Sequence, residues 1–252
     1  MQKHLTLNIV LLLLLVCFAK AEIEDGLVLY LPFDEGQGDE TADLSGKNHD
    51  VSIEGAEWDN GKFGTALSFN GKDNFVEVAF TEDFIITEAI TLGAWVTANV
   101  PFDPAWRGVI NAQKSTYGPF LMQTGGDSKA EVGFYFGGSW TWLRSTTSLE
   151  PDVFHHVVGT YDQDNGLHIY FDGELDDGEG SAGAKPGPID EPPEESIVVG
   201  HNYSLEGRWW DGAIDEVVIY NRALSEDEVA ELSANPLSSA MSVEPGDKLA
   251  TT

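Results

Sequence analysis

The 252-residue sequence contains a single cysteine, so it cannot form an internal disulfide. Disulfide scaffolds and sites built from paired cysteines are therefore excluded. The cysteine, Cys17, lies in the first apolar segment, and a chain that loses this segment has no thiol at all. The alternative is lipid attachment at Cys17, but Val16 is larger than the small residue that precedes the cysteine in such sites.

Basic residues are also scarce. Thirteen lysines and arginines stand against 43 aspartates and glutamates, which gives a net charge of −30. A chain without its first 21 residues also loses Lys3 and Lys20, so 11 basic residues remain against 43 acidic ones, a net charge of −32. Such a field repels nucleic acid and anionic lipid, and we expect neither as a partner. The same field favours solubility and attracts divalent cations.

Long apolar runs are confined to the start of the chain. Lys3 precedes an almost wholly apolar run at residues 7–18, and Ala19-Lys20-Ala21 places small residues at the −3 and −1 positions of a cleavage site. This pattern predicts a secretory signal peptide over residues 1–21. The run is shorter than the roughly 20 residues that span a bilayer. We therefore expect a protein exported to the exterior, the cell surface or the periplasm, with no membrane insertion.

The rest of the chain alternates short apolar segments with turns rich in Gly, Asn and Asp. Such a pattern predicts an all-β protein. Asp164-Asn165-Gly166 is a strong signal for a hairpin turn. The predicted strands are residues 27–33, 75–80, 90–97, 132–136, 140–142, 154–161, 167–171, 197–199 and 213–220.

One short helix is predicted near the C-terminus. Ser225 and Glu228 form a capping-box pattern, in which the serine side chain caps a backbone N–H and the glutamate reaches back. Val229 and Leu232 give the helix an apolar side, and Asn235-Pro236 ends it. The expected organisation is a domain over residues 22–235 and a polar tail or linker over 236–252.

Short motifs in a fixed order extend from about residue 27 to 233. They are LYLPFDEG from Leu29, DLSGKN from Asp43, GKFGTALSFNG from Gly61, FVEV from Phe75, ITLGAWV from Ile90, HHVVGTYD from His155, YFDG from Tyr170, GAIDEV from Gly212 and YNRALS from Tyr220. Together they resemble laminin G-like domains of the concanavalin A-like lectin/glucanase superfamily. The resemblance implies a two-sheet antiparallel jelly-roll sandwich. It does not fix a function, because relatives include glycan-binding modules, adhesion domains, pentraxins and glycosidases.

The string from Glu174 to Glu179 fits the Glu-x-Asp-x-x-Glu pattern of laminarinase-type members of this superfamily. Those enzymes need a nucleophile and an acid/base carboxylate about 5 Å apart on one strand. Here the string contains Gly178 and runs into Gly180, which predicts an acidic loop between residues 176 and 195 rather than a rigid strand. We expect no catalytic residues and no glycosidase activity.

Asp215 is the main candidate metal ligand. It occupies an apolar strand with the parity of Val217, so we expect its carboxylate to face apolar surroundings and to need a partner. Asp34 and Asp43 follow the first strand, which in such jelly rolls runs close to the last. The three aspartates predict a structural calcium site, because calcium takes 6–8 oxygen ligands. Arg222 is the alternative partner of Asp215.

Aromatic residues in loops are candidates for stacking on the apolar face of a sugar ring. The predicted ligand-binding residues are Trp106, Arg107, Tyr117, Asn202 and Tyr203. We expect a non-catalytic lectin-like module whose partner is an extracellular glycan. The alternative is protein–protein adhesion through the same loops, and a glucanase-type hydrolase is the third possibility.

Trp140, Trp142, Trp209 and Trp210 are further candidates for such stacking, but the core is the expected place of Trp140, Trp142 and Trp210. Trp210 occupies a position where the family places a core aromatic, and Trp140 and Trp142 share one face of a predicted strand. Asn202-Tyr203-Ser204 is also a glycosylation sequon, which matters only in a eukaryotic secretory route.

Overall fold

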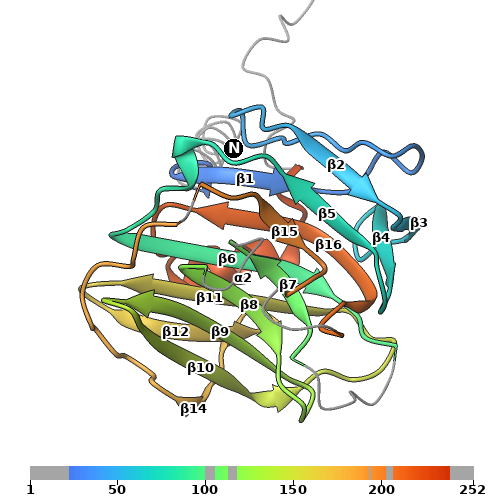
Figure 1. The fold of residues 1–252 in the computed structure, drawn as a ribbon. Coiled ribbons are helices and arrows are strands. Elements are labelled where there is room, and N and C mark those ends of the chain that lie inside the picture. Colours follow the sequence, from blue (N-terminus) through green and yellow to red (C-terminus); the bar gives the residue numbers. More distant parts are fainter. Residues whose placement is uncertain (1–22, 100–105, 113–117, 193, 203–206, 239–252) are drawn as a thin grey trace, which may run out of the picture.

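The computed structural model describes residues 23–99, 106–112, 118–192, 194–202 and 207–238 (Figure 1). In this part of the chain, two antiparallel sheets contain eight strands each. The first sheet contains β1 (Leu27–Leu31), β3 (Glu57–Asn60), β4 (Thr65–Asn70), β6 (Ala89–Val96), β11 (His155–Asp162), β12 (Gly166–Phe171), β13 (Glu174–Leu175) and β16 (Asp211–Tyr220). The second sheet contains β2 (Val51–Glu54), β5 (Phe75–Val78), β7 (Gly108–Asn111), β8 (Phe120–Thr124), β9 (Lys129–Phe136), β10 (Ser139–Ser148), β14 (Asp177–Gly180) and β15 (Ile197–Val199).

The two sheets enclose one large apolar core, which confirms the predicted all-β jelly-roll sandwich. Alternate residues of facing strands supply it, as Leu92 of β6 and Phe134 of β9 illustrate. Because successive side chains of a strand point to opposite faces, the remaining residues of β8, β9 and β10 point away from the core. We call this side the outer face of the second sheet.

A second apolar cluster covers part of the other side of the sandwich. α2 (Glu226–Ala234) packs Val229 and Leu232 against residues of β1 and β16, such as Tyr30. The predicted capping box at Ser225 is confirmed, since Ser225 and Glu228 satisfy each other's backbone N–H groups. Leu237 joins the cluster at 2% exposure, so the packed structure continues past residue 235. No helix in the described residues is long and apolar enough to cross a membrane.

A β-bulge interrupts β16 beside β6. The pairing shifts between Asp215 and Val218, and Glu216 has a positive φ of 51°. Because of the bulge, the regular alternation of side chains between the two faces of the strand does not continue from Asp215 to the residues after it. Ile214 and Val217 both enter the core, so Asp215, next to Ile214, points away from it. The prediction that Asp215 shares a face with Val217 is therefore wrong, because alternation does not continue through a bulge.

Candidate functional site

Three adjacent strands place a polar cluster on the outer face of the second sheet. Glu131 of β9 lies opposite Gln123 of β8 and Arg144 of β10. One carboxylate oxygen of Glu131 accepts a hydrogen bond from Gln123 Nε2 at 2.7 Å, and the other accepts one from Arg144 Nη2 at 2.8 Å. Gln123 and Glu131 are only 5% and 4% exposed, so these bonds fix both side chains in one geometry.

Asn202 extends this cluster. Its amide Nδ2 donates to Gln123 Oε1 at 2.7 Å, and the residue is 1% exposed. We define the polar cluster as Gln123, Glu131, Arg144 and Asn202. Since the amide nitrogen of Asn202 is buried and already bonded, the sequon offers no acceptor for a glycan in the folded protein.

Trp106 and Arg107 lie beside the polar cluster. Arg107 Nη1 donates to the backbone oxygen of Trp209 at 2.7 Å, and the Arg208 guanidinium lies 5.4 Å from the Trp106 ring centroid. Burial lowers the pKa of Arg208, and the charge of Glu131 opposes that shift. Trp106 itself is 39% exposed. The fold thus brings three predicted ligand residues, Trp106, Arg107 and Asn202, to one region, whereas Tyr117 and Tyr203 lie outside the described residues.

Three of the chain's four arginines, Arg107, Arg144 and Arg208, belong to this region. Arg144 is balanced by Glu131, with Asp127 at 3.6 Å as a further partner. In a chain with a net charge of −30, most of the guanidinium groups are thus concentrated here, and Arg144 is surrounded by the carboxylates of Asp127, Glu131 and Glu179. Guanidinium groups are also planar donors suited to oxygen-rich ligands.

Two tryptophans expected in the core lie on the outer face instead. Trp140 and Trp142 are only partly buried, whereas Leu143, which lies between Trp142 and Arg144 on β10, faces the core. The ring centroid of Trp140 lies 5.0 Å from that of Tyr135 on β9. A Cβ atom at Gly133 would lie 2.2 Å from the Trp140 ring, so glycine lets the indole lie across β9. Tyr135, Trp140 and Trp142 form what we call the aromatic platform.

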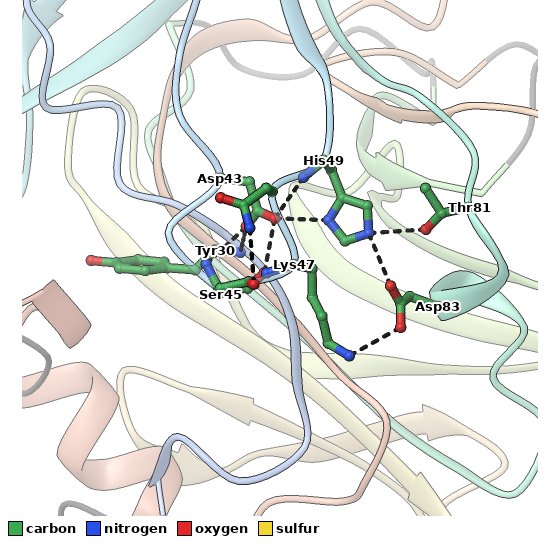
Figure 2. Close-up of polar contacts among 9 residues, drawn as sticks. Tyr30, Asp43, Ser45, Lys47, His49, Thr81 and Asp83 are labelled. Carbon is green, nitrogen blue, oxygen red and sulfur yellow. Dashed lines mark hydrogen bonds and ion pairs between the residues drawn. The ribbon is translucent and has the colours of Figure 1, made fainter.

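Asp43 belongs to a separate buried network (Figure 2). Its carboxylate accepts hydrogen bonds from the backbone of Tyr30 and Ser45 and from His49 Nδ1 at 2.8 Å. Burial opposes ionisation, but the bonds from His49 and the backbone amides outweigh it and lower the pKa of Asp43 to about 2. His49 Nε2 lies 3.0 Å from Thr81 Oγ1. The network therefore ties the connection after β1 to the residue before η1 (Glu82–Phe84).

The order Asp43, His49, Thr81 resembles that of a hydrolase triad, in which a carboxylate orients a histidine towards a hydroxyl. The His49 side chain is 1% exposed, however, and its ring packs 4.5 Å from that of Phe84. A base needs room for substrate beside the hydroxyl that it activates. We therefore interpret the network as a structural tie between two loops.

Asp34 and Asp215 hold the Gly61–Thr65 turn between them. Asp34 Oδ1 accepts from the Thr65 N–H at 3.0 Å, and Asp215 Oδ2 accepts from the Phe63 N–H at 3.1 Å. Burial raises the pKa of Asp215 to about 8. The alternative partner, Arg222, forms a bidentate pair with Glu228 instead, so that hypothesis is wrong.

The three aspartates do not form one ligand set. Asp34, Asp43 and Asp215 are each engaged by different backbone amides. Within the described ranges, no group of three or more His, Cys, Asp or Glu side chains is placed to hold a metal ion. Calcium binding stays a prediction from the sequence, and any ion at one of these residues would need backbone carbonyls and water for most of its 6–8 ligands.

The Glu174–Glu179 string is divided between the two sheets. Glu174 lies in β13 of the first sheet, and Glu179 lies in β14 of the second. Asp177 pairs with His168 at 2.7 Å, and the Glu179 side chain is 73% exposed. The loop predicted for this stretch is thus partly strand. Retaining enzymes of this kind need two closely spaced carboxylates on one strand. The carboxylates of this string do not lie on one strand.

Several solved binding domains are similar to this sandwich in fold. The binding domain of Paraclostridial Mosquitocidal Protein 1 is similar, with a TM-score of 0.66 and 17% identity over 84% of this chain and 52% of that chain. The receptor binding domain of botulinum neurotoxin C/D mosaic serotype has a TM-score of 0.65 and 15% identity over 84% and 51%. The ligand binding domain of botulinum neurotoxin serotype D, in complex with N-acetylneuraminic acid, has a TM-score of 0.66 and 16% identity over 86% and 52%.

The chain spans about half the length of these structures, and identities this low establish the fold alone. No curated protein sequence matches the chain. A family model does match, over residues 70–230, which is more than half of the chain. The resemblance seen in the sequence motifs is therefore confirmed, and the chain belongs to the laminin G-like family of the concanavalin A-like lectin/glucanases superfamily.

Proposed function

We propose that this protein is a secreted, non-catalytic module that recognises an extracellular glycan at the outer face of the second sheet. The observation that carries the proposal is the fixed polar cluster with partly exposed aromatic rings at its sides, Trp142 and Trp106. A sugar presents both hydroxyl groups and an apolar C–H face. Sites for such ligands combine aromatic side chains with a few precisely placed polar groups.

The structural neighbours support this proposal at the level of the fold. Their titles describe binding, receptor-binding and ligand-binding domains, and one of them is a complex with N-acetylneuraminic acid. Protein–protein adhesion through the same face is the alternative. In that case the module would bind an extracellular protein, and removal of the glycans from that protein would leave the affinity unchanged.

Trp106→Ala is expected to weaken glycan binding about tenfold while leaving the melting temperature nearly unchanged. The ring is 39% exposed, so its removal costs little core packing but removes a stacking surface. An aromatic contact of about 0.5–1.5 kcal/mol corresponds to such a change in affinity. A glycan array followed by calorimetry on the best-bound glycan measures the effect.

Leu175→Ala is the matched control, because Leu175 is also exposed, at 48%, but lies on β13 of the first sheet. It should change neither affinity nor melting temperature. Equal weakening by both variants would remove Trp106 from the site. Absence of binding to any glycan on the array would refute the proposed function itself.

The absence of catalysis is part of the proposal. The divided string from Glu174 to Glu179 gives no paired carboxylates on one strand, and Glu131 is bonded to an amide and a guanidinium group. Incubation with laminarin and related β-glucans should release no reducing sugar. Turnover that Glu131→Gln abolishes would show a glucanase instead.

Export is tested at the N-terminus. The apolar run and the Ala19-Lys20-Ala21 pattern predict that the secreted protein begins at Glu22. N-terminal sequencing or intact mass of protein collected from outside the producing cell checks this expectation. A mature chain that begins at a lipid-modified Cys17 would contradict it.

A further inference from the structure

A pocket of about 280 Å³ opens on the second sheet at the end of β9. The residues that line it are Gly118, Pro119, Tyr135, Gly138, Asp190 and Glu191. None of them belongs to the polar cluster, but Tyr135 belongs to the aromatic platform. The pocket is therefore next to the face already described and is distinct from its arginine-rich region.

Asp190 is held in a fixed orientation at this pocket. Its two carboxylate oxygens accept hydrogen bonds from the Gly137 N–H at 2.6 Å and the Gly138 N–H at 2.8 Å. Its own N–H donates to the backbone oxygen of Tyr135 at 2.8 Å. A carboxylate can accept about four hydrogen bonds, so these two leave acceptor capacity for a ligand.

The chemistry of the lining selects for hydrogen-bond donors. Asp190 and Glu191 supply carboxylates, Tyr135 supplies an aromatic ring, and none of the lining residues is a lysine or arginine. A carboxylate or sulfate in the ligand would be repelled by two like charges. An uncharged ring with several hydroxyl groups can donate to the carboxylates and stack on the tyrosine.

The register of β9 and β10 links the pocket to the polar cluster. Tyr135 lies opposite Trp140, Gly133 opposite Trp142, and Glu131 opposite Arg144. Residues at every second position of a strand share one face, and four residues extend about 13 Å. The outward side chains thus run without interruption from the pocket, across the aromatic platform, to the polar cluster. A single sugar ring is too small to contact both ends.

We propose that the pocket and the polar cluster are the two ends of one binding strip for an extended oligosaccharide, whose uncharged end unit occupies the pocket. The inference rests on the proposed glycan recognition and adds two properties of the ligand, its length and the neutrality of one end. Binding should therefore depend on chain length, and acidic groups should be tolerated only away from the pocket.

The test is an array of neutral, uronic-acid and amino-sugar oligosaccharides from mono- to hexasaccharide, followed by calorimetry on the series that binds. Affinity should rise at least about tenfold from the monosaccharide to the longer chains. Trp140→Ala should remove most of that gain without lowering the melting temperature by more than a few degrees, since the ring is partly exposed. Equal affinity for monosaccharide and oligosaccharide would overturn the inference and leave glycan recognition intact. No binding to any member would overturn both.

The neutrality of the ligand's end unit is tested by its own pair of variants. Glu191→Lys reverses a charge at the pocket and should improve binding of uronic-acid oligosaccharides relative to neutral ones by about fivefold or more. Glu194→Lys is the matched control, because Glu194 is an exposed glutamate nearby in the chain that does not line the pocket. Unchanged preference in Glu191→Lys, or an equal change in both variants, would show that the pocket does not hold the ligand. A preference of the native protein for amino-sugar chains over neutral ones would overturn the uncharged end unit.

Discussion

Trp210→Ala is expected to lower the free energy of unfolding by about 3–5 kcal/mol, the usual cost of truncating a buried tryptophan. Trp210 is fully buried and belongs to the main core. Its Nε1 lies 3.1 Å from the backbone oxygen of Thr97 and 3.3 Å from that of Ala213. Alanine would therefore leave a cavity and two carbonyl groups without this donor.

Chemical denaturation of Trp210→Ala, Trp210→Phe and Trp106→Ala separates these contributions. Trp210→Phe keeps an aromatic ring but loses the N–H, so we expect a loss between those of the other two variants. Trp106→Ala should lie within about 0.5 kcal/mol of the native protein, as exposed substitutions usually do. A loss below 1 kcal/mol for Trp210→Ala would mean that this part of the core is not packed as the structure shows.

The fold was predictable from the sequence because local signals and the order of motifs agreed. The strand expected at residues 197–199 is β15 with the same bounds, and the capping box begins α2 after Ser225. Trp210 could be assigned to the core for the same reason, since its position relative to the motif at Gly212 is a property of the family. These features depend on short segments and their order, which a single sequence contains.

It was harder to predict from the sequence which side of a strand faces solvent. Trp140 and Trp142 share a face with Arg144, but neither alternation nor composition says whether that face meets the other sheet. The decisive signal was Gly133, whose missing side chain makes room for Trp140, and it becomes meaningful only when the pairing of β9 with β10 is known. The polar cluster was missed for a similar reason. Gln123 and Glu131 meet through the register of β8 and β9, and Asn202, the one member predicted from the sequence, reaches them from a loop 79 residues after Gln123.

The environment of Asp215 could not be predicted either, because a bulge changes its direction. The carboxylate was expected to need a cation as its partner, and the sequence did not indicate that it also accepts hydrogen bonds from the backbone N–H groups of Phe63 and Glu216. Burial raises the pKa of Asp215 to about 8 and that of Glu216 to about 7. Two adjacent buried acids with raised pKa values have a measurable consequence for the pH dependence of stability.

Between pH 6.5 and 8 the free energy of unfolding is expected to fall by about 2 kcal/mol, at up to 1.36 kcal/mol per pH unit for a group that stays protonated when folded. The unfolded chain ionises Asp215 and Glu216 near their ordinary pKa values of 3.8 and 4.5. The folded state therefore holds extra protons above these values, and its stability falls as the pH rises through the folded pKa values. Burial lowers the pKa of His156 to about 3 and that of His201 to about 4, so both histidines give the opposite slope, but only below about pH 6.5.

The groups that contact Asp215 and Glu216 come from several parts of the chain. Asp215 meets the backbone of Lys62 and Phe63, while Glu216 accepts from the Tyr30 hydroxyl at 2.9 Å and the Leu237 N–H at 3.2 Å. Asp34 adds a negative charge that further raises the pKa of Glu216. Asp215→Asn should remove most of the slope above pH 6.5, because asparagine does not titrate.

Glu194→Gln, an exposed substitution, should leave the slope as it is in the native protein. Urea unfolding at a series of pH values, in calcium and in chelator, measures all three proteins. An ion at Asp215 would favour the ionised carboxylate and lower its pKa, so the native slope would disappear in calcium and return in chelator. The same slope in both solutions would show that Asp215 is accommodated by its own protonation and backbone hydrogen bonds, without calcium. A flat profile in both solutions would contradict the raised pKa values.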